Sequence, residues 1–151
     1  MTGEKQAAEA RIDLVIDQSK PDQGSLLAAI DGFAAARALS ETLRYRLGLI
    51  VDELVTNCIV HGACLSRGNE IRVTVEDREN ELFVEIIDAG QTFDPTATPP
   101  PQCPQTGQVA VGGVGLSLVR RFAEWAHYNR SDNRNHLRLS LKKNDTTPNA
   151  A

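Results

Sequence analysis

The chain has 151 residues, 41% of them hydrophobic and 24% charged, which suits one globular domain with its own core and leaves no room for a second full domain. Its formal net charge of -4 at pH 7 gives no broad basic field, so nucleic acid and anionic membranes are disfavoured as partners, and a protein or a small molecule is expected instead. Three cysteines without a C-x-x-C pair argue against a disulfide framework and a zinc site, and no apolar run is long enough to span a bilayer, so we expect a cytoplasmic protein.

The first half of the chain predicts a strand followed by two helices. Apolar and polar residues alternate in "RIDLVIDQ", which indicates a strand with one buried face. The alanine-rich segment from Ser25 to about Leu39 has helical propensity. A second helix is predicted from Ser40, a candidate N-cap, to Gly62, a candidate stop. The core stripe expected on this second helix consists of Leu47, Ile50, Val51, Leu54 and Cys58.

The second half predicts a β-hairpin, a long loop, a helix and a closing strand. The alternating runs "EIRVTVED" and "ELFVEIID" are separated only by Arg78, Glu79 and Asn80, which is a hairpin signature. The stretch that follows, "AGQTFDPTATPPPQCPQTGQVAVGGVG", is long for a loop in a compact domain and is therefore either disordered or functional. The run "LSLVRRFAEWAH" has a helical pattern and "HLRLSLKK" an alternating one, so a helix and a final strand are expected.

This order of elements predicts an α/β fold built as a two-layer sandwich. The helices are grouped so that they can cover one face of a mostly antiparallel mixed sheet. We expect the domain to span residues 11–143, between a flexible N-terminus at 1–10 and a flexible C-terminal tail at 144–151.

The second predicted helix carries polar residues beside its apolar stripe. Glu53 and Asn57 are one helical turn apart, at the rim of the expected core. At such a rim the carboxamide oxygen of Asn57 could bind Mg²⁺, and the carboxylate of Glu53 could accept a proton. Both residue types also occur on solvated helix faces, so the spacing alone leaves the two interpretations open. His61, directly before a glycine, is more often a helix C-terminal residue that interacts with the helix dipole.

A second group of candidate residues follows the predicted hairpin. Asp88 comes directly after an apolar strand and shortly before Gly90, so its carboxylate emerges where the backbone can approach a flat ligand closely. The same residues are also ordinary turn formers. Phe93 would by default anchor the following loop on the core.

A third group is the glycine cluster Gly112, Gly113 and Gly115, directly before a predicted helix. Free backbone amides and the positive end of the helix can face an anion there. A hinge or a tight entry into the helix would use the same glycines. The cluster lacks the lysine of a P-loop and does not open a parallel βαβ unit.

In this order and at these separations, the three groups resemble the motifs of the GHKL superfamily of ATP-binding domains. Within it the chain is most similar to the anti-sigma-factor serine kinases of bacterial partner-switching systems. The N-box is "DELVTNCIVHG", the G1 box is "DAGQTFDP" and the G2 box is "GGVGLSLVRRFAEW". The resemblance covers the chain from about Arg11 to Lys143 and implies the Bergerat ATP-binding fold.

The resemblance implies roles for these positions. Asn57 would hold the Mg²⁺ that bridges the phosphates of ATP, and Glu53 would be the general base that takes the proton from an attacking hydroxyl. Asp88 would accept a hydrogen bond from the adenine amino group. Further nucleotide contacts would come from Gly90, Phe93, Gly112, Gly113, Val114, Gly115 and Leu116. The proline-rich stretch from Gln91 to Val111 would be an ATP lid.

The implied function is that of a serine/threonine-protein kinase that uses Mg-ATP. It would phosphorylate a STAS-domain anti-anti-sigma protein, would also contact a sigma factor or another regulator, and would form a homodimer. The alternative is an ATP-binding interaction module that sequesters a partner without transferring phosphate. A histidine kinase is disfavoured, because we see no helical hairpin with a phosphoacceptor histidine before the domain.

The chain departs from the family's pattern at one place. Before the last strand, members often carry a glycine-threonine pair, whereas this chain has Asn133, Arg134, Asn135 and His136. The resemblance therefore leaves the outer contact to adenine unassigned.

Overall fold

The computed structural model describes residues 10–17, 20–62, 70–90 and 114–143. In chain order these residues form β1 (Arg11–Asp17), α1 (Gln23–Ala36), α2 (Glu41–Gly62), β2 (Glu70–Asp77), β3 (Glu81–Asp88), α3 (Val114–Phe122), β4 (Ala123–Ser131) and β5 (Arg134–Lys142). The predicted C-terminal tail, nearly all of the predicted flexible N-terminus, the proline-rich lid, Phe93, Gly112 and Gly113 lie outside the described residues.

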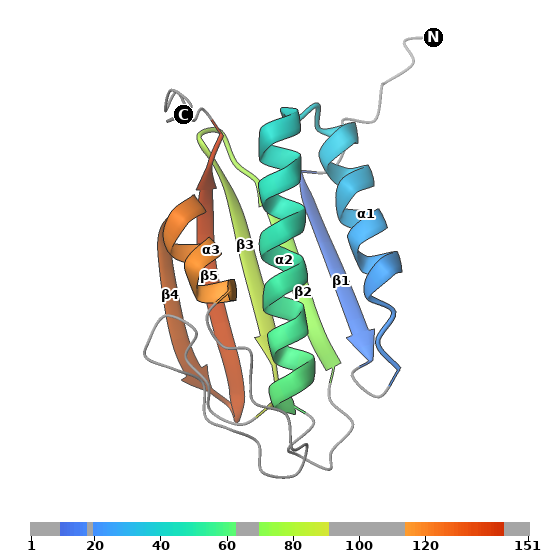
Figure 1. The fold of residues 1–151 in the computed structure, drawn as a ribbon, viewed down its shortest axis with the longest axis vertical. Helices are drawn as coiled ribbons and strands as arrows, with labels where there is room; N and C mark the ends of the chain where they lie inside the picture. Colours follow the sequence, from blue (N-terminus) through green and yellow to red (C-terminus); the bar gives the residue numbers. More distant parts are fainter. Residues whose placement is uncertain (1–9, 18–19, 63–69, 91–113, 144–151) are drawn as a thin grey trace, which may run out of the picture.

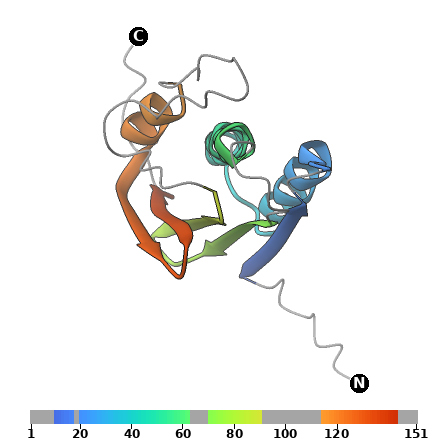
Figure 2. The same ribbon diagram turned by 90° about the horizontal axis from the view of Figure 1, so that it is seen from below.

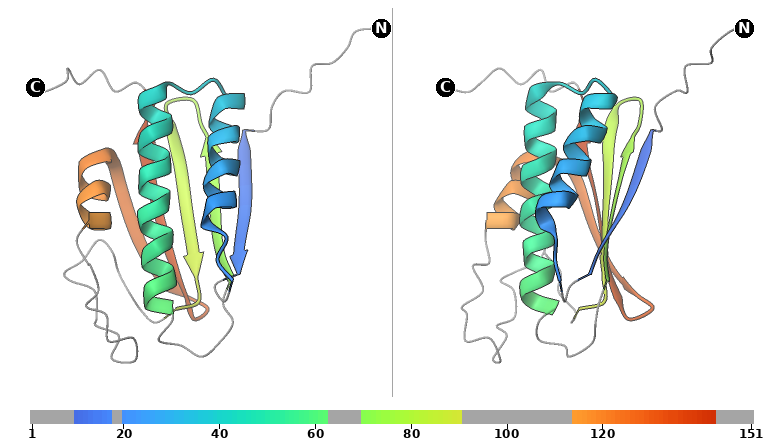
Figure 3. Two further views of the ribbon diagram at one scale, coloured as in Figure 1. Left: turned by 45° about the vertical axis from the view of Figure 1, so that its right-hand side comes forward. Right: turned by 90° about the vertical axis from the view of Figure 1, so that its right-hand side faces the viewer.

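The strands form a five-stranded sheet in the order β1-β2-β3-β5-β4, and each neighbouring pair is antiparallel. Figure 1 shows α1, α2 and α3 in front of this sheet, and Figure 2 shows all three on its concave side. α1 contacts β1, α2 contacts β3 and α3 contacts β4, so the helices lie side by side across one face (Figure 3). The predicted two-layer α/β sandwich is confirmed.

α1 begins and ends slightly earlier than the sequence predicts. The Asp22 carboxylate accepts hydrogen bonds from the backbone N and the Oγ of Ser25, at 3.0 and 2.7 Å, which makes Asp22 the N-cap. After the helix, Ala38 has a φ of 55°, a left-handed conformation that stops the helix before Leu39.

α2 begins where the sequence predicts. The Oγ of Ser40 accepts a hydrogen bond from the backbone N of Leu43 at 3.2 Å, as an N-cap does. The Gln23 side chain, at the start of α1, donates to the backbone oxygen of Asp52 at 3.0 Å and to Thr56 Oγ1 at 2.9 Å. This contact fixes the start of α1 against the middle of α2, next to Glu53.

α2 supplies the centre of the hydrophobic core. Four of the predicted stripe residues, Leu47, Ile50, Val51 and Leu54, are buried. They belong to one cluster with the inward side chains of the sheet, which include Ile71, Val73, Val75, Leu82, Val84, Ile86, Leu137, Leu139 and Leu141. The fifth stripe residue, Cys58, is only partly buried and lies at the edge of this cluster.

The predicted helix in "LSLVRRFAEWAH" is wrong in its second half. α3 ends at Phe122, and Ala123 begins β4, which pairs with β5 along its length. The two strands are joined by a two-residue turn in which Asp132 and Asn133 have φ values of 54° and 59°. Two successive positive φ values define the tight hairpin turn that asparagine and aspartate favour, so the hairpin overrides the local helical pattern.

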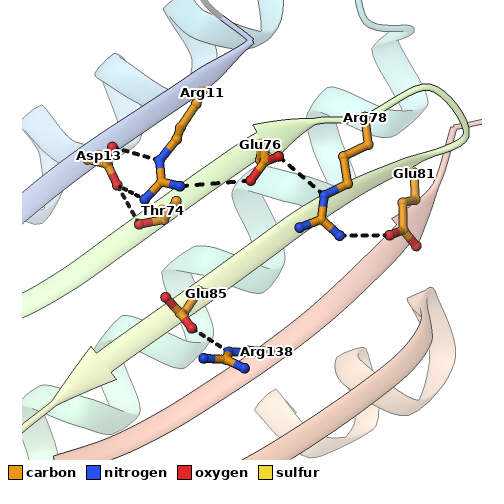
Figure 4. A network of polar contacts seen from close by, with 8 residues as sticks. All are labelled: Arg11, Asp13, Thr74, Glu76, Arg78, Glu81, Glu85 and Arg138. Atoms are coloured by element: carbon orange, nitrogen blue, oxygen red, sulfur yellow. Dashed lines mark hydrogen bonds and ion pairs between the residues drawn. The ribbon is translucent and has the colours of Figure 1, made fainter.

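The other face of the sheet is polar. Figure 4 shows paired charges on the side away from the helices, including Arg78 with Glu81 at 3.2 Å and Arg138 with Glu85 at 2.5 Å. The Asp13 carboxylate accepts hydrogen bonds from Arg11 on its own strand and from Thr74 Oγ1 on β2. Such exposed pairs add little stability each, but they explain why the strands alternate between apolar and charged residues.

Candidate functional site

A small pocket lies between the C-terminal half of α2 and three strands of the sheet. Its lining is formed by Leu54, Asn57, Cys58, Ile86, Asp88, Tyr128, Asn135 and Leu137. Four elements, α2, β3, β4 and β5, therefore meet at this site. Apolar walls with a few converging polar groups are typical of a small-molecule site.

The Asp88 carboxylate is the charged group of this pocket, and it is only 8% exposed at the end of β3. Its Oδ1 accepts hydrogen bonds from the backbone N of Gly90 at 2.8 Å and from Asn135 Nδ2 at 3.1 Å. Its Oδ2 receives the thiol of Cys58 at 3.3 Å, and a thiol is a weak donor. Oδ1 of the carboxylate is thus occupied by two strong hydrogen bonds within the protein, whereas Oδ2 accepts one weak hydrogen bond and can accept another from a ligand.

The thiol of Cys58 is shaped by this neighbour. Burial, and after it the negative charge of Asp88, raises the pKa of Cys58 well above its ordinary value. Because the thiolate is the nucleophilic form, Cys58 is a neutral wall of the pocket and a poor nucleophile.

α2 places Asn57 in the pocket wall and Glu53 one turn earlier, with both side chains partly buried. Glu53 is not among the described residues that line the pocket. A carboxamide and a carboxylate on one helix offer hard oxygen atoms, the ligand type that Mg²⁺ prefers. No group of three or more His, Cys, Asp or Glu in the described ranges could hold a metal ion.

The remaining predicted site residues are only partly placed. Gly90 is buried beside Asp88, and its backbone N is the donor described above. Val114, Gly115 and Leu116 form the first turn of α3, so the helix begins two residues before the predicted Leu116. Phe93, Gly112 and Gly113 cannot be placed against the pocket, because they are outside the described residues. The structure thus brings Asn57, Asp88 and Gly90 to one site.

Sequence reasoning missed three residues of this site. Tyr128 Oη donates to Asn135 Oδ1 at 2.6 Å, and Arg130 Nη1 donates to the backbone oxygen of Gly90 at 2.7 Å. Tyr128 and Arg130 lie on β4, the strand that the sequence pattern did not predict. Asn135 was noted only as a departure from a family pattern. The one available signal was the Asp132-Asn133 turn, which would have revealed β4 as the partner of β5.

A partly buried amide on α2 and a buried carboxylate at a strand end thus line one mostly apolar pocket. Residues 18–141 match the family described as histidine kinase-like ATPase domain, and the chain belongs to this family. The predicted membership of the GHKL superfamily is therefore confirmed.

Among individual proteins, the chain is similar to the serine/threonine-protein kinase BtrW of Bordetella bronchiseptica. The two are 34% identical over 102 residues, which is 67% of this chain and 72% of the relative. Two solved structures of the catalytic domain of histidine kinase ThkA are 13% and 14% identical, with TM-scores of 0.47 and 0.48. Their alignments cover 87% and 88% of this chain and 98% and 95% of those chains.

Membership of this family implies that the protein binds ATP, and the side chains that line the pocket are of the kinds that contact a purine base. The apolar side chains offer flat contact area, and Asp88 Oδ2 offers an acceptor for an exocyclic amino group. The oxygen donors of Asn57 and Glu53 suit Mg²⁺ in kind, and the ion itself belongs to the proposal below. No helix among the described residues is long and apolar enough to cross a membrane.

Proposed function

We propose that the protein is a cytoplasmic serine/threonine-protein kinase of the anti-sigma type, which transfers the γ-phosphoryl group of Mg-ATP to a hydroxyl of a protein partner. The carrying observation is the pocket in which buried Asp88 faces Asn57, with Glu53 one turn away on the same helix. Family membership and the 34% identity to a serine/threonine-protein kinase support this proposal.

Each residue has a distinct task in the proposed reaction. Asp88 accepts a hydrogen bond from the exocyclic amine of adenine and thereby sets the position of the nucleotide. Asn57 supplies an oxygen ligand to Mg²⁺, which would neutralise the charge on the phosphates. Glu53 accepts the proton of the partner's serine or threonine hydroxyl as that oxygen attacks the γ-phosphorus, while the bond from the γ-phosphorus to the bridging oxygen breaks and ADP leaves. Phosphoryl transfer needs little beyond such positioning and charge stabilisation.

We propose a STAS-domain anti-anti-sigma protein as the phosphorylated partner. A sigma factor or another regulator would be the second protein that this kinase binds in turn. We also expect a homodimer, and sedimentation that shows only monomer at working concentration would remove this part of the proposal.

The test is the intact mass of a STAS-domain protein from the same genome after incubation with this protein and Mg-ATP. The native protein should add one phosphate to the partner, and Glu53→Gln should not, because a carboxamide cannot accept the proton. Glu41→Gln is the matched control, since Glu41 is an exposed glutamate in the first turn of the same helix.

A second outcome would select the alternative function. If candidate partners bind in the presence of ATP and none gains mass, the site serves assembly, and the protein is an interaction module without phosphotransfer. The position of Glu53 outside the pocket lining is the observation that keeps this alternative in view. Transfer to a histidine of a partner would instead indicate a histidine kinase.

A further inference from the structure

Asn135 is the second residue of β5. It lies in the segment where this chain departs from the family's pattern and where the resemblance left the outer contact to adenine unassigned. It is the direct partner of Asp88 in the β3–β5 ladder and is only 4% exposed. Its Nδ2 donates to Asp88 Oδ1 at 3.1 Å, and the residue also lines the pocket. A buried amide beside the base-recognising carboxylate is therefore part of the site's wall.

The orientation of this amide is fixed by two donors. Asn135 Oδ1 accepts hydrogen bonds from Tyr128 Oη at 2.6 Å and from Arg130 Nη1 at 3.0 Å. A flipped amide would turn its NH₂ group toward these two donors and its oxygen toward the carboxylate of Asp88. The contacts with Arg130, which can only donate, and with the Asp88 carboxylate, which can only accept, would be repulsive, so the donor end of Asn135 must face Asp88.

The same contacts close a ring around the end of β3. Arg130 Nη1 also donates to the backbone oxygen of Gly90, and the backbone N of Gly90 donates to Asp88 Oδ1. Asp88 Oδ1 is thus held from two sides, by Gly90 and by Asn135. With Oδ1 held, the carboxylate has one orientation, in which Oδ2 accepts only the weak thiol donor of Cys58 and keeps acceptor capacity for a ligand.

We propose that Asn135, oriented by Tyr128 and Arg130, is the positioning residue that aims Asp88 at the exocyclic amino group of the nucleotide base and so determines the preference for adenine. The inference rests on the ATP-binding part of the proposed function. Asn135 takes no part in phosphoryl transfer, so the effect of replacing it is measured on nucleotide binding alone.

The test compares the dissociation constants of ATP and of purine riboside triphosphate, which lacks the 6-amino group. In the native protein, one hydrogen bond to a carboxylate should favour ATP by about ten- to a hundredfold. In Asn135→Ala the preference should fall at least about fivefold, because Asp88 loses one of the donors that orient it. The affinity for the analogue should stay within about twofold, since the analogue makes no contact with Asp88.

This pattern separates positioning from general damage, because a distorted pocket would weaken both nucleotides together. Asn129→Ala is the matched control, since Asn129 is an exposed asparagine on β4, and it should leave the preference unchanged. An undiminished preference in folded Asn135→Ala overturns the inference. If the native protein binds neither nucleotide, the proposed function fails instead, and the two failures are thereby distinguished.

A second variant covers the case in which Asn135→Ala does not fold. Asn135→Asp keeps the size of the side chain and an oxygen acceptor for Tyr128 and Arg130, but it places a second carboxylate against Asp88. Two facing carboxylates share a proton, which weakens Asp88 as an acceptor. A reduced ATP preference in this variant supports the inference, and a preference equal to that of the native protein overturns it.

Discussion

Asp88→Asn should change which nucleotide base the pocket accepts. The new carboxamide has one oxygen, and the backbone N of Gly90 and Asn135 Nδ2 both require an acceptor on the Oδ1 side. The amide should therefore place its oxygen there and its NH₂ group where Oδ2 now lies. In the variant a donor faces the pocket in place of the native acceptor.

The magnitude follows from the lost hydrogen bond. A bond between an amino group and a carboxylate contributes about 1.5–3 kcal/mol, so its loss alone weakens ATP about ten- to a hundredfold. The facing NH₂ groups of the variant and of adenine add a further cost. A base with a carbonyl oxygen at the 6-position, as in inosine or guanosine triphosphate, would instead find a donor, and its affinity relative to ATP should rise.

Isothermal titration of the native protein and the variant with ATP and with inosine triphosphate measures both effects. Asp31→Asn is the control, because Asp31 is an exposed aspartate on α1 that pairs with Arg44 at 2.9 Å. It should leave the affinities of both nucleotides unchanged. If Asp88→Asn binds ATP within about threefold of the native protein, the role of Asp88 in base recognition is refuted.

Two further predictions concern the charge and the thiol that the fold buries. Asp77, with its side chain 3% exposed, pairs with Arg37 at 2.7 Å and with Lys143 at 2.5 Å, so Asp77→Asn should lower the free energy of unfolding in urea by about 2–3 kcal/mol. Burial opposes ionisation of Asp77, but the hydrogen bonds from Lys143 and Arg37 outweigh this effect and lower the pKa of Asp77. The stabilisation from the ionised Asp77 is therefore complete above about pH 4 and is lost as the pH falls through the lowered pKa of the folded state. Asp77→Asn should lack this loss of stability at acid pH. Cys58, with its raised pKa, should react with iodoacetamide near neutral pH at least about tenfold more slowly than in the urea-unfolded chain, as peptide mass mapping would show, and equal rates would contradict its burial beside Asp88.

The elements that the sequence predicted well are those with strong local signals. The strands of the β2–β3 hairpin alternate over eight residues each, and their short connection leaves one simple pairing. α2 runs for 22 residues with a continuous buried stripe and a serine at its N-cap. In both cases the local pattern and the tertiary packing favour the same structure.

β4 was missed because its local pattern is weak and its environment decides its structure. Its inward residues Ala126, Tyr128 and Arg130 are only partly buried, and one of them is charged, so the apolar alternation of the strand is weak. The apolar spacing of α3 continues by chance through Ala123 and Ala126, which extends the helical pattern into the strand. Pairing with β5 across the Asp132-Asn133 turn overrides that spacing.

The same distinction applies to the site. Asp88 and Asn57 were found because each stands out in its own segment, a carboxylate after an apolar strand and an amide beside a helical stripe. Asn135 acts through a contact 47 residues away in the sequence, and it meets Asp88 only because β5 pairs with β3 in one register. A shift of that register by one residue would turn Asn135 to the opposite face of the sheet. The choice of base thus depends on the pairing of β3, β5 and β4, and the two residues that orient Asn135, Tyr128 and Arg130, come from β4, the strand that local patterns could not predict.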